Sequence, residues 1–293
     1  MLLREWLETW LETYIDPLRA PSTAAGYRQA LKKLPTPFLS QKLDAVTAFD
    51  CQRVINQVAA ETPRQAQICL VVLRSALKRA QRLGMVQHNP AGDVEAPKHE
   101  KSAPKYLDLC ELQALLRAAE RTKSHKAILL MAALGLRRGE ALGLCYGDLR
   151  GEHAHITRQR NAKGQMVPLK TRASRRVLPV APDLRRQLGT GAPAAPVCDV
   201  SARILAQDLA KAAAEAGVGH VTPHMLRHTF ASQAISGGVN MRLLQSLMGH
   251  AHFEVTADTY SHVYRPDLDA AGIKVCGRLL PEVPRHVARL EIV

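Results

Sequence analysis

The sequence predicts a mainly α-helical protein with a small antiparallel β-sheet, in which an all-α helical bundle precedes an α+β domain. Three observations predict this fold class. The first 96 residues are rich in helix formers and contain no segment with strand character. Segments with β-rich alternation lie between residues 153 and 180. Helical spacing of apolar residues then resumes at Ser201.

Four helices are expected in the first segment, over residues 2–14, 22–33, 47–60 and 62–83. The last of these has the clearest pattern. Its apolar residues recur at helical spacing from Ile68 to Leu77, and Gly84 follows as a C-terminal stop.

The second segment opens with a capping box, because Asp108 is followed three residues later by Glu111 and then by an apolar run. A buried helix, AILLMAALG, ends at Gly135. The stretches HAHITR, MVPLK and RRVLPV predict the small antiparallel sheet, and a helix is expected over residues 201–216. Thr222 and Pro223 suit the N-cap and first position of a further helix.

These elements divide into a helical domain over residues 1–96, a linker over 97–106 and a second domain over 107–293. The composition of residues 89–106 supports the linker, because this stretch has three prolines, mixed charge and few apolar residues. The tail, residues 266–293, has an apolar side that suggests a helix and a closing strand.

The composition favours a polyanionic partner. The chain of 293 residues has a formal net charge of +14 and a sequence pI near 9.8. Aromatic residues make up only 4%, which weakens the hypothesis of a stacking platform for single strands. The six cysteines include no C-x-x-C pair, so a reducing cytoplasm fits best, and no apolar run reaches the ~18 residues of a membrane span.

A cationic helix face supplies the first candidate site. His224, Arg227 and His228 share one face of the helix that begins at Thr222, near its positive end, where an anion is favoured. A zinc site is a poor interpretation, because the glutamate of an H-E-x-x-H motif is missing and Arg227 adds a cation. A histidine bonded to backbone in the core remains an alternative for His228.

Two further basic motifs each allow two interpretations. In GLRRGE, Glu140 lies three residues after Arg137 and could hold that guanidinium toward phosphate oxygens, although a solvated arginine is the commoner case. In LKTRASRR, Lys170 lies at the edge of the expected hairpin. It could donate a proton to a leaving oxygen, or the loop could simply grip a DNA backbone.

Tyr260 is the candidate nucleophile. LMGH places His250 at a helix end, and short polar residues separate it from Tyr260. A phenol has a pKa near 10, and neighbouring arginines make its oxyanion more accessible. Packing is the ordinary role of a tyrosine, and it is the interpretation for Tyr264.

The ordered set GLRRGE, LKTRASRR, HMLRHTFAS, LMGH and TADTYSHV resembles the tyrosine recombinase family, which includes phage integrases and Xer-type resolvases. The N-terminal segment is similar to the helical core-binding (SAM-like) domain of that family through ST-x-x-x-Y at residues 22–27 and the NPA junction at Asn89. His250 and Tyr260 are ten positions apart, where many members have nine. His252 could take the role of His250, and Arg138 could likewise take the role of Arg137.

The resemblance implies a role for each of six catalytic residues, Arg137, Lys170, His224, Arg227, His250 and Tyr260. The two arginines would clamp the scissile phosphate, and Lys170 would protonate the leaving 5′-oxygen. His224 and His250 would contact non-bridging oxygens or assist proton transfer, and Tyr260 would form a 3′-phosphotyrosyl bond. A phosphodiester transition state needs positioned donors, and the covalent bond conserves energy for religation, so no metal, ATP or other cofactor is expected.

The sequence therefore predicts a cytoplasmic, site-specific recombinase that acts on double-stranded DNA, of a mobile-element integrase type. A monomer is expected in free solution and a homotetramer on DNA. Two alternatives are a strand cutter like a type IB topoisomerase and a DNA-binding regulator without catalysis. A missing arginine, lysine or tyrosine would have favoured the regulator, and all are present.

Overall fold

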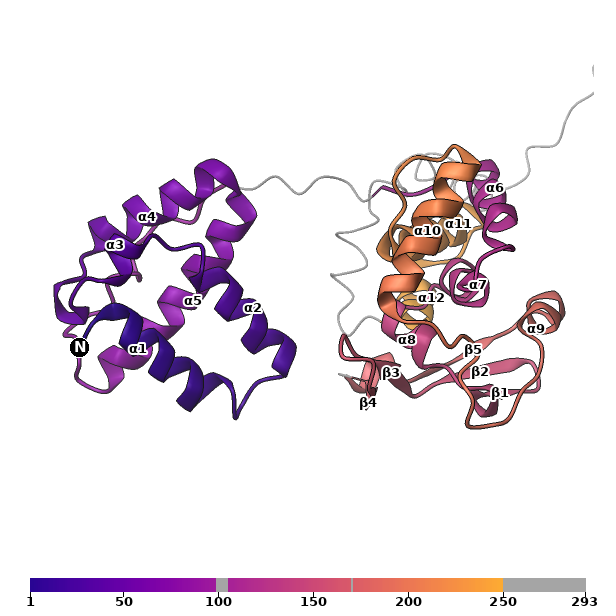
Figure 1. The fold of residues 1–293 in the computed structure, drawn as a ribbon, viewed down its shortest axis with the longest axis horizontal. Helices are drawn as coiled ribbons and strands as arrows, with labels where there is room; N and C mark the ends of the chain where they lie inside the picture. The colour runs from indigo at the N-terminus through magenta and orange to yellow at the C-terminus, as the bar shows by residue number, and fades with distance from the viewer. Residues whose placement is uncertain (99–104, 170, 250–293) are drawn as a thin grey trace, which may run out of the picture. The chain divides into compact units, whose positions relative to one another are not determined.

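The computed structural model describes residues 1–98, 105–169 and 171–249 (Figure 1). The chain divides into two compact units, Met1–Ser102 and Ala103–Val293. Each unit has a buried hydrophobic core of its own. Among the described residues, no helix is both long enough and apolar enough to cross a membrane.

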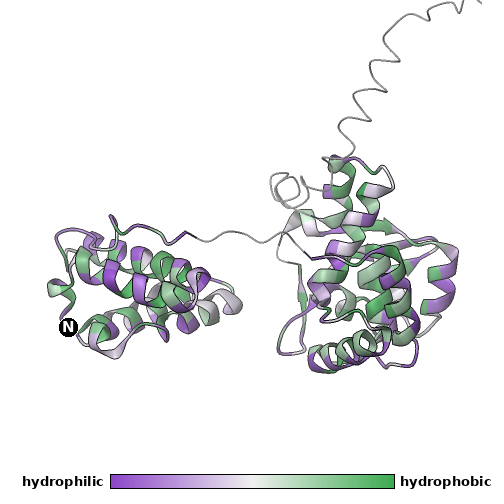
Figure 2. Ribbon diagram, turned by 90° about the horizontal axis from the view of Figure 1, so that it is seen from above, coloured by the Kyte–Doolittle hydropathy of each residue, from purple (hydrophilic) through white to green (hydrophobic). Residues whose placement is uncertain are grey.

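Helices form the core of the first unit. Its elements are α1 (Leu3–Trp10), a π-helical turn (Leu11–Ile15), α2 (Pro21–Leu31), α3 (Thr36–Leu39), a 3₁₀ turn (Leu43–Ala45), α4 (Ala48–Glu61) and α5 (Pro63–Arg82). The four expected helices are present with shifted ends, and α3 is an addition. The helices carry hydrophobic and hydrophilic residues on different sides (Figure 2), and the Trp6 indole donates to the Ala76 carbonyl at 3.1 Å, which ties α1 to α5.

The beginning of the stretch that the composition predicts to be an extended linker is bound to the first unit. Arg74 on α5 donates to the carbonyls of Ala91 and Val94 at 3.0 and 2.5 Å. Asn89 in turn donates to the Arg74 carbonyl at 3.1 Å. Ala91 and Val94 are buried in the helical core. Composition does not reveal these backbone partners, which hold residues 89–94 to the helical unit.

The second unit packs other helices around the buried helix α7 (His125–Leu134). The other helices are α6 (Leu109–Ala119), α8 (Arg138–Gly143), α9 (Pro182–Leu188), α10 (Ala202–Ala216), α11 (Pro223–Ser236) and α12 (Met241–Met248). The expected helix starts are confirmed. Asp108 and Glu111 exchange hydrogen bonds of 2.8 Å, and Thr222 accepts from the Met225 N–H at 3.1 Å. The sequence analysis did not predict α9.

The described strands form two small antiparallel sheets, where one was expected. One sheet has the order β1 (Leu149–Arg150), β2 (His153–Ile156), β5 (Arg176–Pro179), and the other pairs β3 (Arg158–Arg160) with β4 (Met166–Pro168). In the first sheet, Ala154 lies opposite Leu178, and both are buried. Strand β3 of the other sheet packs against α8.

Candidate active site

Three arginines bind the carboxyl-terminal end of α12. Arg176 Nε donates to the Leu247 carbonyl at 2.8 Å, Arg227 Nη2 to the Met248 carbonyl at 2.5 Å, and Arg137 Nη2 to the Gly249 carbonyl at 3.2 Å. The last carbonyls of a helix lack intrahelical donors and carry partial negative charge. The cationic side chains therefore satisfy these carbonyls and fix where α12 ends.

Arg227 is the most enclosed of the three, with only 3% of its surface exposed. Its Nη1 also donates to the Gly135 carbonyl at 2.6 Å, which links α11 to the end of α7. Gly135 has φ = 61°, and a Cβ there would lie 2.4 Å from Phe230 Cδ1. Glycine is therefore required where α7 ends and its carbonyl faces Arg227.

Arg137 precedes α8 and is held by Glu140 of that helix. Its Nη1 donates to Glu140 Oε1 at 2.8 Å, and its backbone N–H donates to Glu140 Oε2 at 3.0 Å. About a third of the Arg137 side chain, 34%, is exposed. The rival Arg138 occupies the first position of α8, and its side chain is exposed. The geometry therefore brings Arg137 into the arginine cluster.

Glu140 also holds Arg176, which the sequence analysis assigned no separate role. Arg176 Nη2 donates to Glu140 Oε2 at 2.9 Å, and both side chains are buried. Burial raises the pKa of Glu140, but the hydrogen bond and charge of Arg176, together with Arg137, outweigh it and hold that pKa below its usual value. One carboxylate thus offsets two guanidinium groups.

The end of α12 also lies against the segment that precedes β5. Gly249 has φ = 62°, and a Cβ there would approach Arg176 Nη1 at 3.1 Å and the Ala173 carbonyl at 3.2 Å. Arg176 Nη1 donates to the Ser174 carbonyl at 3.0 Å. Arg176 therefore connects three parts of the unit: α8, α12 and the residues before β5.

His224 belongs to the same neighbourhood. It lies at the surface in the first turn of α11, and its ring centroid is 6.1 Å from that of His228. Desolvation on its protein side and the charges of Arg227, Arg137 and Arg138 lower the pKa of His224. The pKa of His228 is lowered by desolvation and by the charges of His224 and Arg227. Both rings are therefore neutral near pH 7.

Of the six residues expected to be catalytic, the structure brings together Arg137, Arg227 and His224. Lys170, His250 and Tyr260 lie outside the described residues, as do His252, which is the rival of His250, Tyr264 and the tail, residues 266–293. Sequence reasoning missed the role of Arg176, because a basic residue before a strand looks like the other arginines of its loop. The sequence contained one partial signal for this role: the Glu140 carboxylate has two oxygens and can bind a second arginine besides Arg137.

Comparison with known proteins places both units in one group. Residues 105–266 match the model of the phage integrase family, and residues 2–59 match that of the phage integrase N-terminal SAM-like domain. Tyrosine recombinase XerC of Pelobacter propionicus is 30% identical over 264 residues, which cover 83% of this chain and 85% of the relative. XerC of Alcanivorax borkumensis is 31% identical over 83% of this chain and 84% of the relative.

Solved structures share the fold at low identity. The Tn1549 transposon integrase in complex with a circular intermediate DNA has a TM-score of 0.77 at 18% identity, and the match covers 95% of this chain and 100% of that one. A lambda integrase dimer bound to a COC′ core site has a TM-score of 0.67 at 18% identity, with coverage of 86% and 96%.

Glu140→Gln is expected to lower the free energy of unfolding by about 3 kcal/mol, because a neutral amide leaves two guanidinium groups without their buried counter-charge. Urea unfolding followed by circular dichroism measures the change. Asp183→Asn is the matched control, since the Asp183–Arg186 pair is 77% and 74% exposed and should contribute little. A loss in Glu140→Gln no larger than that of the control would contradict this role.

His224→Gln is expected to flatten the pH dependence of stability. The folded-state pKa of His224 lies below the ordinary value of 6.5, so the unfolded chain binds a proton more readily. The wild-type chain should therefore lose stability relative to the variant as the pH falls below about 6.5, and the difference should be constant above it. Urea unfolding at several pH values tests this, and parallel profiles would refute it.

Proposed function

The chain belongs to the phage integrase family and is a tyrosine recombinase, and from this premise we propose that it cuts and rejoins double-stranded DNA through a 3′-phosphotyrosyl intermediate. The observation that carries the proposal is the convergence of Arg137, Arg227 and His224 beside the end of α12. The motif residue His250 follows that end directly in the sequence.

Arg137 and Arg227 would bind the scissile phosphate. A guanidinium has five N–H donors in a planar fork that matches two phosphate oxygens. Among the described residues, the Arg137 side chain uses two of these donors, for Glu140 and Gly249. Three donors therefore remain for the non-bridging oxygens, where negative charge accumulates in the transition state. The neutral ring of His224 would donate one further hydrogen bond.

Tyr260 would attack the phosphorus atom through its phenolic oxygen. A new bond forms between Tyr260 Oη and phosphorus while the bond from phosphorus to the 5′-oxygen breaks. Lys170 would give that oxygen a proton. The phenolic proton of Tyr260 would pass to a neighbouring base, and His250 would assist proton transfer. The 5′-hydroxyl of another strand then attacks the phosphotyrosyl bond and releases Tyr260, so one phosphodiester replaces another without ATP.

The domain roles are part of the proposal. The helical unit, residues 1–96, would bind one face of the duplex and the catalytic domain, residues 107–293, the other, joined by the linker over 97–106. The match of residues 2–59 to the SAM-like domain model and the net charge of +14 support this assignment. The enzyme would act in the cytoplasm, as a monomer in free solution and a homotetramer on DNA.

Integration and excision of a mobile element is the biological role that we propose. A resolvase role is a second candidate, and the identity of 30% to a protein named XerC favours it. Recombination between two DNA sites cloned from the flanks of the gene distinguishes the roles. Sites on separate molecules should be joined by an integrase, whereas a resolvase should act only on two sites within one circle.

Tyr260→Phe is expected to abolish covalent attachment to a nicked suicide substrate, while the affinity for duplex DNA changes less than about twofold. One hydroxyl supplies the nucleophile, whereas affinity comes from many phosphate contacts. Denaturing electrophoresis measures the adduct. If the adduct persists in Tyr260→Phe and is lost only in Tyr264→Phe, then Tyr264 is the nucleophile and the assignment of Tyr260 is wrong.

Arg137→Ala is expected to lower the rate of strand cleavage by ~100-fold or more, and Arg137→Lys should recover only part of it because lysine lacks the bidentate fork. Arg138→Ala is the matched control, with an expected change below about threefold. Single-turnover cleavage gives the rates. If Arg138→Ala is the damaging variant and Arg137→Ala is mild, the clamp has been assigned one residue too early.

Deletion of residues 266–293 is expected to spare DNA binding by one protomer and to damage strand exchange, because a tail that follows the nucleophile can link protomers on DNA. Gel-shift and recombination assays compare the truncated and full chains, and light scattering should find the full chain monomeric without DNA. Normal recombination by the truncated chain, or a stable tetramer in free solution, would refute this role.

A further inference from the structure

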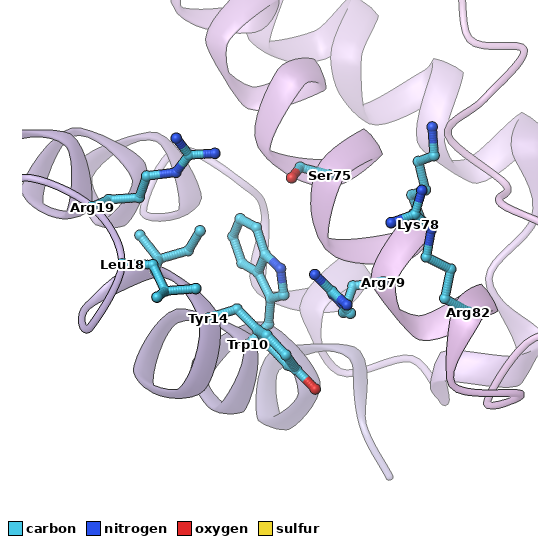
Figure 3. A pocket seen from close by; sticks show the side chains of 9 residues that line it. Trp10, Tyr14, Leu18, Arg19, Ser75, Lys78, Arg79 and Arg82 are labelled. Atoms are coloured by element: carbon cyan, nitrogen blue, oxygen red, sulfur yellow. The ribbon is translucent and has the colours of Figure 1, made fainter.

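A pocket of about 360 Å³ lies in the first unit, between the end of the α1 segment and the last turns of α5. Figure 3 shows Leu18 and Arg19 projecting from one wall, and Ser75, Lys78, Arg79 and Arg82 from the other. Trp10, Tyr14 and Ile15 line it from the helical side. The pocket is formed by one unit alone and is separate in sequence from the arginine cluster of the second unit.

The charge of this pocket is not balanced within the unit. Arg19, Lys78, Arg79 and Arg82 line it, and no carboxylate of the described residues does. The ion pairs of the first unit, Arg28–Asp16 and Arg53–Asp50, involve none of these four cations. Asp16 is near in sequence but is held by two hydrogen bonds from Arg28.

The pocket is also partly ordered before any ligand enters. The Arg79 guanidinium carbon lies 4.5 Å from the centroid of the Tyr14 ring, a cation–π contact that holds Arg79 at the wall. The Trp10 ring stacks on Tyr27 at 6.0 Å between centroids and is fixed in the core. A positioned guanidinium loses less conformational freedom when it binds an anion.

We propose that this pocket binds a small organic polyphosphate, such as a nucleoside di- or triphosphate. Several unpaired cations around one concavity match a ligand with two or more negative charges. The Leu18 side chain, 72% exposed, gives an apolar wall for the rest of the ligand. A volume of about 360 Å³ is in the range of small-molecule sites, whereas a duplex is convex and can touch only the rim.

The binding experiment uses the full chain and follows tryptophan fluorescence. This signal reports on the pocket, because both tryptophans of the sequence, Trp6 and Trp10, lie in α1 and Trp10 lines the pocket. Titration with ATP is expected to change tryptophan fluorescence with saturation at one equivalent, and calorimetry gives the affinity. Tripolyphosphate should bind more weakly than ATP because it has no apolar part. Adenosine should not bind. A lack of saturable ATP binding up to millimolar concentration would overturn the proposal.

Variants locate the site. Arg79→Gln and Arg82→Gln should each weaken ATP binding by about tenfold or more, and circular dichroism verifies that each variant is folded. The Arg82 side chain is exposed and makes no hydrogen bond or ion pair within residues 1–98, so its replacement should leave the fold intact even if Arg79→Gln does not. Arg53→Gln, which removes an exposed cation outside the pocket, is the matched control and should bind normally. Equal losses in Arg53→Gln and Arg82→Gln would mean non-specific attraction and would refute the site.

Leu18→Ser tests the apolar wall. It should bring the affinity for ATP down to that for tripolyphosphate and leave the affinity for tripolyphosphate unchanged.

The phosphates of DNA are the competing source of the same chemistry. If Arg82→Gln weakens duplex binding by about tenfold while ATP binding is unaffected, the pocket is a DNA contact and the proposal is wrong. Because these titrations involve no strand cleavage, their outcome is independent of the proposed recombination mechanism.

Discussion

The attachment of three arginines to the last carbonyls of α12 is the interaction on which the catalytic unit depends. Arg137 comes from the start of α8, Arg176 from the start of β5 and Arg227 from within α11. These elements are far apart in the sequence, so the end of α12 cannot move without breaking contacts to all of them. The residues that follow α12 in the sequence therefore begin from a fixed point, which favours the positional accuracy that the proposed strand transfer would need.

Within this cluster, the arginines differ in whether they serve the fold alone or remain accessible to a ligand. Glu140 contacts both Arg137 and Arg176, and its lowered pKa reflects their stabilisation of its charged form. Arg176 is buried, whereas Arg137 remains one-third exposed. One guanidinium is thus committed to the fold, and another, held by the same carboxylate, faces an accessible space. On α11, desolvation and then the charges of neighbouring cations lower the pKa values of His224 and His228.

The two cationic sites of this chain differ in construction. In the catalytic unit the guanidinium groups are anchored on backbone carbonyls and a buried carboxylate. In the helical unit, the Arg79 guanidinium lies over the aromatic ring of Tyr14, and its cationic neighbours are exposed. The first arrangement suits a transition state that must be held rigidly, and the second suits reversible binding of a ligand that brings its own charge.

The sequence by itself determined the fold class, the helix starts at Asp108 and Thr222, and the family, because capping chemistry and ordered motifs are local and survive without tertiary information. It also indicated the pairing of Arg137 with Glu140, since three residues span one helical turn. Only the tertiary structure decided that Arg176 shares that carboxylate, that the strands form two sheets, and that residues 89–97 bind α5. Arg176 and Glu140 are 36 positions apart in the sequence, and Arg74 and Ala91 are 17 apart, and no local pattern records such partners.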